Sequence, residues 1–168
     1  MVDKQQLLEK LGYISTEGKL MKNISILLKI AAVLWIIWGA VHILAGVLTM
    51  SAIFGGDIAG GISGIADAID PATLQLDYPD AVGGLLGQHG FNLFWIGFVT
   101  LISAFFIWRG SANAIFLAAI TGGLADVGYF LFMDLGGYVN FVPGTVMTFV
   151  SATAIILSFY VYLIGERA

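Results

Sequence analysis

The chain has 168 residues, of which 59% are hydrophobic and 11% are charged, and its formal net charge is −4 at pH 7. A soluble domain carries roughly 25% charged residues, so this composition cannot cover a water-facing surface and predicts an integral membrane protein. The chain has no cysteine, which excludes a disulfide scaffold, thiolate chemistry and iron–sulfur clusters. The acidic balance also excludes a nucleic-acid partner.

Residues 1–23 form the first expected unit, a cytoplasmic N-terminal segment with no apolar stretch long enough for a signal peptide. Within it, residues 2–13 could lie on the membrane as a short amphipathic helix, with leucines on one side and lysines on the other. A frayed polar tail is the alternative interpretation.

Four apolar stretches follow, each long enough to cross a bilayer, which takes about 20 residues of helix. They cover residues 24–50, 81–108, 112–133 and 141–164. Arg109 and Gly110 end the second stretch, and Pro143 falls in the first turn of the fourth, where its missing N–H is tolerated. The sequence therefore predicts an all-α integral membrane four-helix bundle over residues 24–164, including an outer loop at 51–80.

The orientation follows from the basic residues, because those that flank membrane spans stay in the cytoplasm. All of them fall on one side of the predicted bundle: Lys4, Lys10, Lys19, Lys22, Lys29, Arg109 and Arg167. The connections on the other side carry acidic residues instead: Asp57, Asp67, Asp70, Asp77, Asp80 and Asp134. We expect a protein of the plasma (inner) membrane with both termini in the cytoplasm.

The outer loop is too long and too apolar to be a plain connection. An isoleucine stripe recurs in it at helical spacing, and Pro71 ends the pattern. The stripe consists of Ile58, Ile62, Ile65 and Ile69. We predict a short interfacial helix over the outer mouth of the bundle, which either acts as a lid or rests among the lipid headgroups.

Three titratable residues lie inside the predicted spans, where a charge costs about 2.5–3.5 kcal/mol on insertion scales. They are His42, His89 and Asp126. At about 1.5 Å per residue, they lie roughly 27, 28 and 21 Å from the cytoplasmic ends of their helices. We therefore expect a polar site in the outer half of the bundle, with His42 and Asp126 in contact and Asp134 at the outer boundary.

Gln88 and Asn92, beside His89, are the other candidate binding residues, because each could hold a ring nitrogen of that histidine. If the second helix begins near residue 81, glycines beside His89 form a smooth groove for a ligand; if it begins near Gly90, His89 is interfacial. The groove glycines are Gly83, Gly84, Gly87 and Gly90.

Three occupants of this site are compatible with the residue types. Haem b could take His42 and His89 as axial ligands from two helices, and a metal ion could take His42, His89 and Asp126 together. A lipophilic small molecule is the third. The sequence contains no zinc-hydrolase or phosphate-loop motif, so it assigns no catalytic residue. We expect Trp35, Trp38 and Trp95 to fill the core or face lipid.

Three functions follow from these observations. In the first, the bundle binds a cofactor or ligand in its outer half. In the second, Asp126 and His42 relay protons or ions in a small coupled channel or carrier. In the third, the chain is an accessory or assembly subunit of a larger membrane complex, whose polar residues only lock helix packing. Besides the lipid bilayer, the expected partners are another membrane protein or further copies of the chain.

Overall fold

The computed structural model describes the backbone of residues 13–165 and the side chains of residues 26–164. This part of the chain is helical, without strands. It contains four helical stretches long and apolar enough to cross a membrane: Ile26–Phe54, Asp80–Trp108, Ala112–Asp134 and Phe141–Ile164. The prediction of four helices with the length and apolarity needed to cross a membrane is thus confirmed. Residues 2–12 of the expected surface helix lie outside the described residues.

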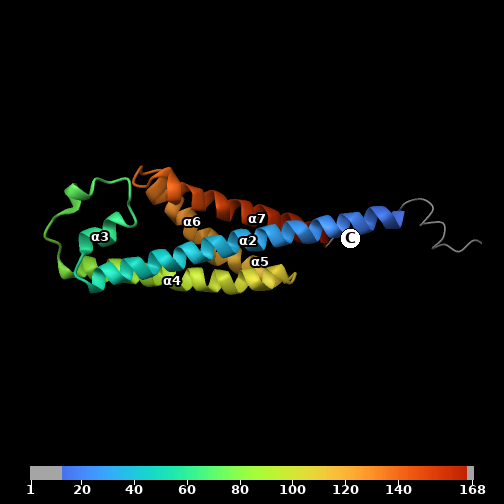
Figure 1. Cartoon of the computed structure of the whole chain (residues 1–168), viewed down its shortest axis with the longest axis horizontal. Helices are drawn as coiled ribbons and strands as arrows, with labels where there is room; N and C mark the ends of the chain where they lie inside the picture. Colours follow the sequence, from blue (N-terminus) through green and yellow to red (C-terminus); the bar gives the residue numbers. More distant parts are fainter. Residues whose placement is uncertain (1–12, 166–168) are drawn as a thin grey trace, which may run out of the picture.

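The first helix, α2 (Tyr13–Phe54), is longer than predicted at both ends. Its 42 residues correspond to about 63 Å, roughly twice the thickness of the hydrocarbon core. In Figure 1 it extends beyond the ends of α4 and α5. The predicted helix starts at residue 24, where the apolar run starts. Polar residues without proline can continue a helix outside the bilayer, so the observed helix starts earlier.

Glycines set the packing of α2 against α4 (Asp80–Trp108). A Cβ atom added to Gly46 would lie 2.5 Å from the carbonyl oxygen of Gly90, and one added to Gly97 would lie 2.7 Å from that of Gly39. The two helices run antiparallel, so the pairs Gly39–Gly97 and Gly46–Gly90 bring the two backbones together at two levels. Small residues are the usual device for such close approach in membranes.

The third span is an α-helix interrupted by two wider, π-helical turns. It runs through α5 (Ala112–Ala118), η2 (Ala119–Gly123), α6 (Leu124–Tyr129) and η3 (Phe130–Asp134), of which η2 and η3 are π-helical. A π turn contains an extra residue and so rotates the helix that follows it. The short α6 segment, which carries Asp126, therefore has a π turn at each end.

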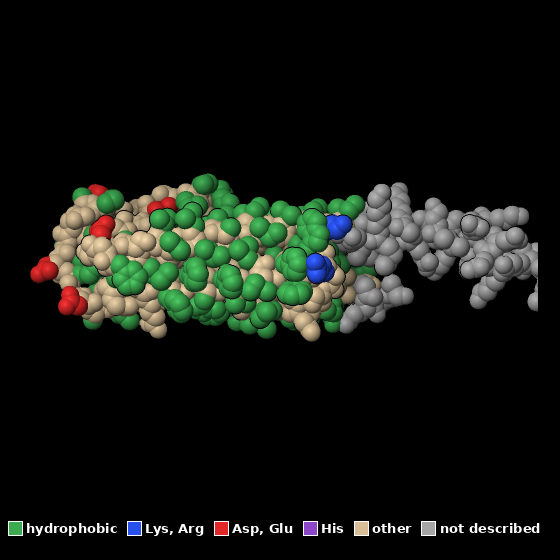
Figure 2. All heavy atoms as spheres, turned by 60° about the horizontal axis from the view of Figure 1, so that its bottom comes forward, with side chains coloured by type: hydrophobic (Ala, Val, Ile, Leu, Met, Phe, Trp, Pro, Cys, Tyr) green, Lys and Arg blue, Asp and Glu red, His purple; other side chains and the backbone are tan. Residues whose placement is uncertain are grey.

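The fourth span begins with η4 (Phe141–Thr145) and continues as α7 (Val146–Gly165). Pro143 lies in its first turn, as predicted. Between the four spans the core is made of two fully buried indoles and many alanines. The buried cluster comprises Ala32, Trp35, Trp38, Ala104, Ile107, Ala114, Ile115, Ala118 and Ala154. The larger aliphatic and phenyl side chains mostly point outward, where Figure 2 shows a continuous apolar surface.

Charge separates to the two ends of the bundle (Figure 2). Lys29 and Arg109, the basic residues whose side chains the structure describes, mark the basic end. The opposite end, which we call the acidic end, carries the aspartates of the first long connection: Asp57, Asp67, Asp70, Asp77 and Asp80.

The connection at the acidic end is less helical than predicted. The isoleucine stripe suggested one helix from Ile58 to Ile69, but α3 spans only Ile58–Ser63. The Asp57 side chain caps it by accepting the Gly60 N–H at 2.7 Å. Glycine weakens helices by about 1 kcal/mol per residue, and three glycines within five residues end this one after less than two turns. A 3₁₀ turn, η1 (Pro71–Leu74), follows before α4.

Candidate functional site

The centre of the site is a buried contact between α2 and α6. The indole Nε1 of Trp38 donates a hydrogen bond of 2.7 Å to Oδ2 of Asp126. The other carboxylate oxygen, Oδ1, lies 3.9 Å from Nε2 of His42. Asp126 is only 4% exposed and Trp38 is fully buried, so the carboxylate is held between an indole and an imidazole away from bulk water.

Trp38, one helical turn earlier, contacts both the ring face and Nδ1 of His42. Its ring stacks on the Trp38 indole with the ring centroids 3.6 Å apart and the planes 20° from parallel. Nδ1 of His42 lies 2.8 Å from the backbone carbonyl oxygen of Trp38. A carbonyl oxygen only accepts, so Nδ1 donates and carries the hydrogen, which leaves Nε2 to face Asp126.

The third and fourth spans are shaped to bring Asp126 to this position. A Cβ added to Gly122, one turn before Asp126, would lie 2.7 Å from the Trp35 ring and 3.3 Å from the Trp38 ring. Glycine there lets the helix approach both indoles. From α7, the buried Ser151 hydroxyl lies beside the carboxylate. Asp126, on α6, is therefore flanked by α2 and α7.

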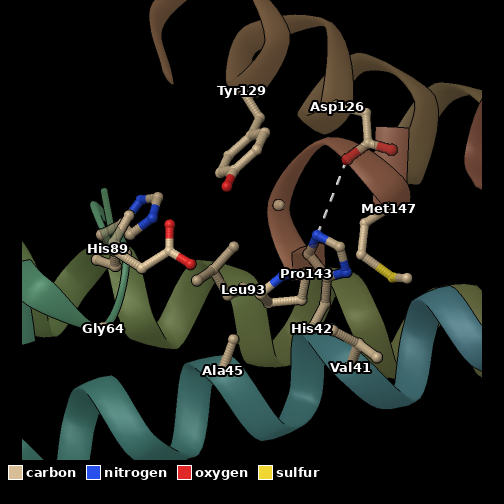
Figure 3. A pocket seen from close by; sticks show the side chains of 13 residues that line it. Val41, His42, Ala45, Gly64, His89, Leu93, Asp126, Tyr129, Pro143 and Met147 are labelled. Atoms are coloured by element: carbon tan, nitrogen blue, oxygen red, sulfur yellow. Dashed lines mark ion pairs between the residues drawn. The ribbon is translucent and has the colours of Figure 1, made fainter. Parts of the chain in front are cut away.

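A cavity of about 110 Å³ opens beside this contact. Figure 3 shows His42, Asp126, His89 and Tyr129 around it, with Leu93 and Met147 among its apolar walls. The remaining lining residues are Val41, Ala45, Gly64, Ile65, Asp67, Pro143 and Gly144. The cavity thus draws on all four spans and on the connection that follows α3.

The two connections at the acidic end are joined over the cavity. The Asp67 carboxylate accepts the backbone N–H of Asn140 at 2.7 Å, and the Asn140 side-chain amide donates to the Asp67 carbonyl at 3.0 Å. The Ala68 N–H also donates to the Tyr138 carbonyl at 3.1 Å. We call these three hydrogen bonds the latch. Since Asp67 also lines the cavity, the latch fixes part of its wall.

The structure brings three of the five candidate residues to one cavity. His42, His89 and Asp126 line it, and the predicted contact of His42 with Asp126 is confirmed. Gln88 is exposed, and the Asn92 side chain accepts a 3.0 Å hydrogen bond from Trp95 Nε1 on an exposed face. Among the described residues, neither lines the cavity.

α4 begins at Asp80, close to the expected residue 81, yet His89 is exposed, and most of the glycines expected to form a groove beside it are used in helix packing. A Cβ on Gly83 would touch Ile58 at 3.3 Å, and one on Gly87 would touch Ile53 at 3.7 Å. Gly90 packs against Gly46. Gly83, Gly87 and Gly90 therefore pack against α2 and α3, whereas nothing lies within 4 Å of a Cβ added to Gly84.

Asp134 is more than a boundary residue. Its two carboxylate oxygens accept hydrogen bonds from Thr145 (2.5 Å) and Thr148 (3.2 Å). The bonds tie the end of the third span to the start of the fourth. Two hydroxyl residues of the fourth span, Thr145 and Thr148, therefore bind Asp134, while Ser151 is the hydroxyl beside Asp126.

The positions of His42, His89 and Asp126 decide whether the site can hold a metal ion or haem. Within the described residues, no three His, Asp or Glu side chains are close enough to share a metal ion, so the three-ligand metal hypothesis gains no support. For haem, Nε2 of His42 would have to face an iron, but it faces Asp126 at 3.9 Å while the ring face is covered by Trp38. A cavity of about 110 Å³ is also smaller than the roughly 150 Å³ that holds one benzene. The residues do not fit haem.

Trp38 is the site residue that the sequence did not reveal. We had expected it to fill the core, which it does, but its Nε1 also supplies the hydrogen bond that orients Asp126. The available signal was the spacing of four between Trp38 and His42, which places the two rings on one helix face. Comparison of the chain with protein families, curated proteins and solved structures gives no match.

Proposed function

We propose that this protein binds a small molecule within its membrane bundle, in the cavity between His42, His89, Asp126 and Tyr129. The observation that carries the proposal is the placement of Asp126. Its carboxylate is almost fully buried in a membrane-spanning bundle, next to a cavity rather than sealed in packing. An acid in such a position is expensive to maintain and is commonly functional.

The chemistry of the lining supports this function. Hydrogen-bond donors and acceptors lie among apolar side chains such as Leu93 and Met147. This is the usual composition of a small-molecule site. The basic flanks and the acidic opposite end support an orientation with both termini in the cytoplasm. In that orientation the cavity lies in the outer half of the plasma (inner) membrane.

Because the chain has no cysteine, a single introduced thiol can report on the cavity. Ala45→Cys places a thiol in the lining, and Leu44→Cys places one on the adjacent position, which is 58% exposed on the apolar surface. With the protein in nanodiscs, a water-soluble methanethiosulfonate should label Ala45→Cys faster than Leu44→Cys.

Binding is then measured as protection of Ala45→Cys from that reagent. Four probes share a butyl body and differ in the polar group: butylamine, butanol, butyrate and butyltrimethylammonium. Slower labelling with at least one of them supports the proposal, provided that Leu44→Cys labelling is unaffected. Equal labelling of the two thiols, or no protection by any of the four probes, overturns it.

A further inference from the structure

His42 and Asp126 turn hydrogen-bond acceptors toward each other at the site. The pair therefore lacks either one hydrogen or one positive charge. Nδ1 of His42 holds its hydrogen against the Trp38 carbonyl, so Nε2 of the neutral ring is an acceptor. It faces Oδ1 of Asp126 across 3.9 Å, and an ionised carboxylate also only accepts. Two acceptors at this distance are compatible when a donor lies between them or beside both.

One proton satisfies the pair, either as a charged His42 or as a protonated Asp126. A ligand that carries both a positive charge and at least two N–H donors satisfies it equally. From one nitrogen, two N–H groups can reach Nε2 and Oδ1: acceptors 3.9 Å apart subtend about 87° at hydrogen-bond lengths of about 2.8–2.9 Å, so each bond departs from its tetrahedral N–H direction by about 11°, which stays within the favoured range.

The surroundings favour a cation. The lining contains two carboxylates, from Asp67 and Asp126, and no Lys or Arg among its described residues. The acidic end, through which a ligand from that side would arrive, adds further aspartates, whose field raises the local concentration of cations. The apolar walls can contact a short hydrocarbon body, and because the cavity holds only about 110 Å³, a butyl chain would extend from the charged group toward the cavity opening.

We propose that the ligand of this cavity is a primary or secondary ammonium ion with a short apolar body, and that its binding displaces one proton from the His42–Asp126 pair. The inference rests on the proposed small-molecule function and names its ligand class. In the exchange, the ammonium arrives with all its protons, donates N–H bonds to Nε2 and Oδ1, and the displaced proton leaves to water. The charge of the site is unchanged.

Several other groups face this pair and set the pH range of the exchange. His89 approaches from α4, Tyr129 from α6, and Asp67 from the connection after α3. Asp134 lies on the same span as Asp126, as the last residue of the π turn η3. For an exchange of one proton, the affinity should rise about tenfold per pH unit, as long as the pair is protonated without ligand and the amine stays protonated.

The test uses the whole chain in nanodiscs with the four butyl probes. We expect butylamine to slow labelling of Ala45→Cys and, with the cysteine-free chain in weak buffer, to release about one proton per bound amine. Butanol, which matches butylamine in size but carries no charge, should bind at least tenfold more weakly, and so should butyrate; butyltrimethylammonium, which lacks N–H and adds three methyl groups, should also bind at least tenfold more weakly. Asp126→Asn should abolish both signals, whereas Asp77→Asn, which removes an aspartate at the acidic end outside the cavity lining, should preserve them.

The outcomes separate this inference from the function on which it rests. Protection by butanol or butyrate without protection by butylamine keeps a small-molecule site and overturns the ammonium ligand. Butylamine binding without proton release, or equal binding of butyltrimethylammonium, overturns the exchange. If Asp126→Asn does not fold, His42→Gln provides the second variant: proton release that persists in it at the parent level also overturns the exchange.

Discussion

The Trp38 indole N–H points at Oδ2 of Asp126 from 2.7 Å, joining two helices across 88 positions of the chain. This one bond orients the carboxylate so that its other oxygen faces His42. A buried acceptor that loses its donor is destabilising, and here the acceptor is also the charged group of the candidate site. Trp38 therefore contributes to both stability and binding geometry.

Replacement of Trp38 by Phe should lower the free energy of unfolding more than replacement of Trp35 by Phe. Both indoles are fully buried, but Trp35 Nε1 has no hydrogen-bond partner among the described residues. The two variants lose similar volume, so the difference between them reports the bond to Asp126, together with the stacking of the Trp38 ring on His42 and the removal of the unpaired Trp35 N–H. We expect a difference of about 1–3 kcal/mol in denaturant unfolding in detergent. Equal losses would contradict this expectation.

The glycine contacts between α2 and α4 should tolerate no added methyl group. In Gly46→Ala the new Cβ would lie 2.5 Å from the Gly90 carbonyl oxygen and 2.6 Å from the Phe94 nitrogen. Because both are backbone atoms, the helices must separate, at a cost of about 1–3 kcal/mol. The control is Gly84→Ala on α4, where nothing lies within 4 Å of the added Cβ. Thermal unfolding should rank Gly46→Ala well below Gly84→Ala.

Substitution of Asp134 should affect stability, whereas substitution of Asp126 should affect binding. Asp134→Ala removes the acceptor of Thr145 and Thr148 and should lower stability by about 1–3 kcal/mol, while butylamine still protects Ala45→Cys. Asp126→Asn keeps an oxygen for Trp38 and should lose the protection. The reverse pattern in the labelling assay would place the binding site at Asp134.

Loosening the latch should open the cavity. Asn140→Ala removes the side-chain donor to the Asp67 carbonyl, so we expect the methanethiosulfonate to label Ala45→Cys several-fold faster. Thr73→Ala serves as the control, because its hydroxyl bonds to the Asp70 carbonyl within η1, in the same connection but outside the latch. An unchanged rate in Asn140→Ala would mean that reagents enter by another route.

The proposed orientation has a simple test. A reporter that is active only outside the cytoplasm should be silent when it is fused after Ala168 and active when it is inserted after Asp77, in the connection at the acidic end. The expectation comes from the positive-inside distribution of lysine and arginine. The opposite pattern of activity would invert the topology and place the cavity in the inner half of the membrane.

The sequence by itself determined the membrane architecture. Long apolar runs must form helices in lipid, because only a helix pairs all its backbone groups there. For this reason the third and fourth spans and the end of the second were predicted to within a residue, whereas the start of the second was left open between Ala81 and Gly90. The pairing of His42 with Asp126 was also predictable, since helix rise fixes depth and a buried carboxylate needs a partner.

Tertiary structure decided what lies around that pair. The residue count along a helix gives the depth of a side chain, but not the rotation of one helix about its axis relative to another. The π turns on both sides of α6 change that rotation. Only the packed bundle shows that Trp38 contacts Asp126 and that most of the glycines beside His89 contact helices. The contacts of Trp38 and of the glycines depend on side-chain direction across helices distant in sequence, which local pattern does not encode. The bond between Asn92 and Trp95 joins residues three apart on α4, a spacing that helix periodicity does indicate.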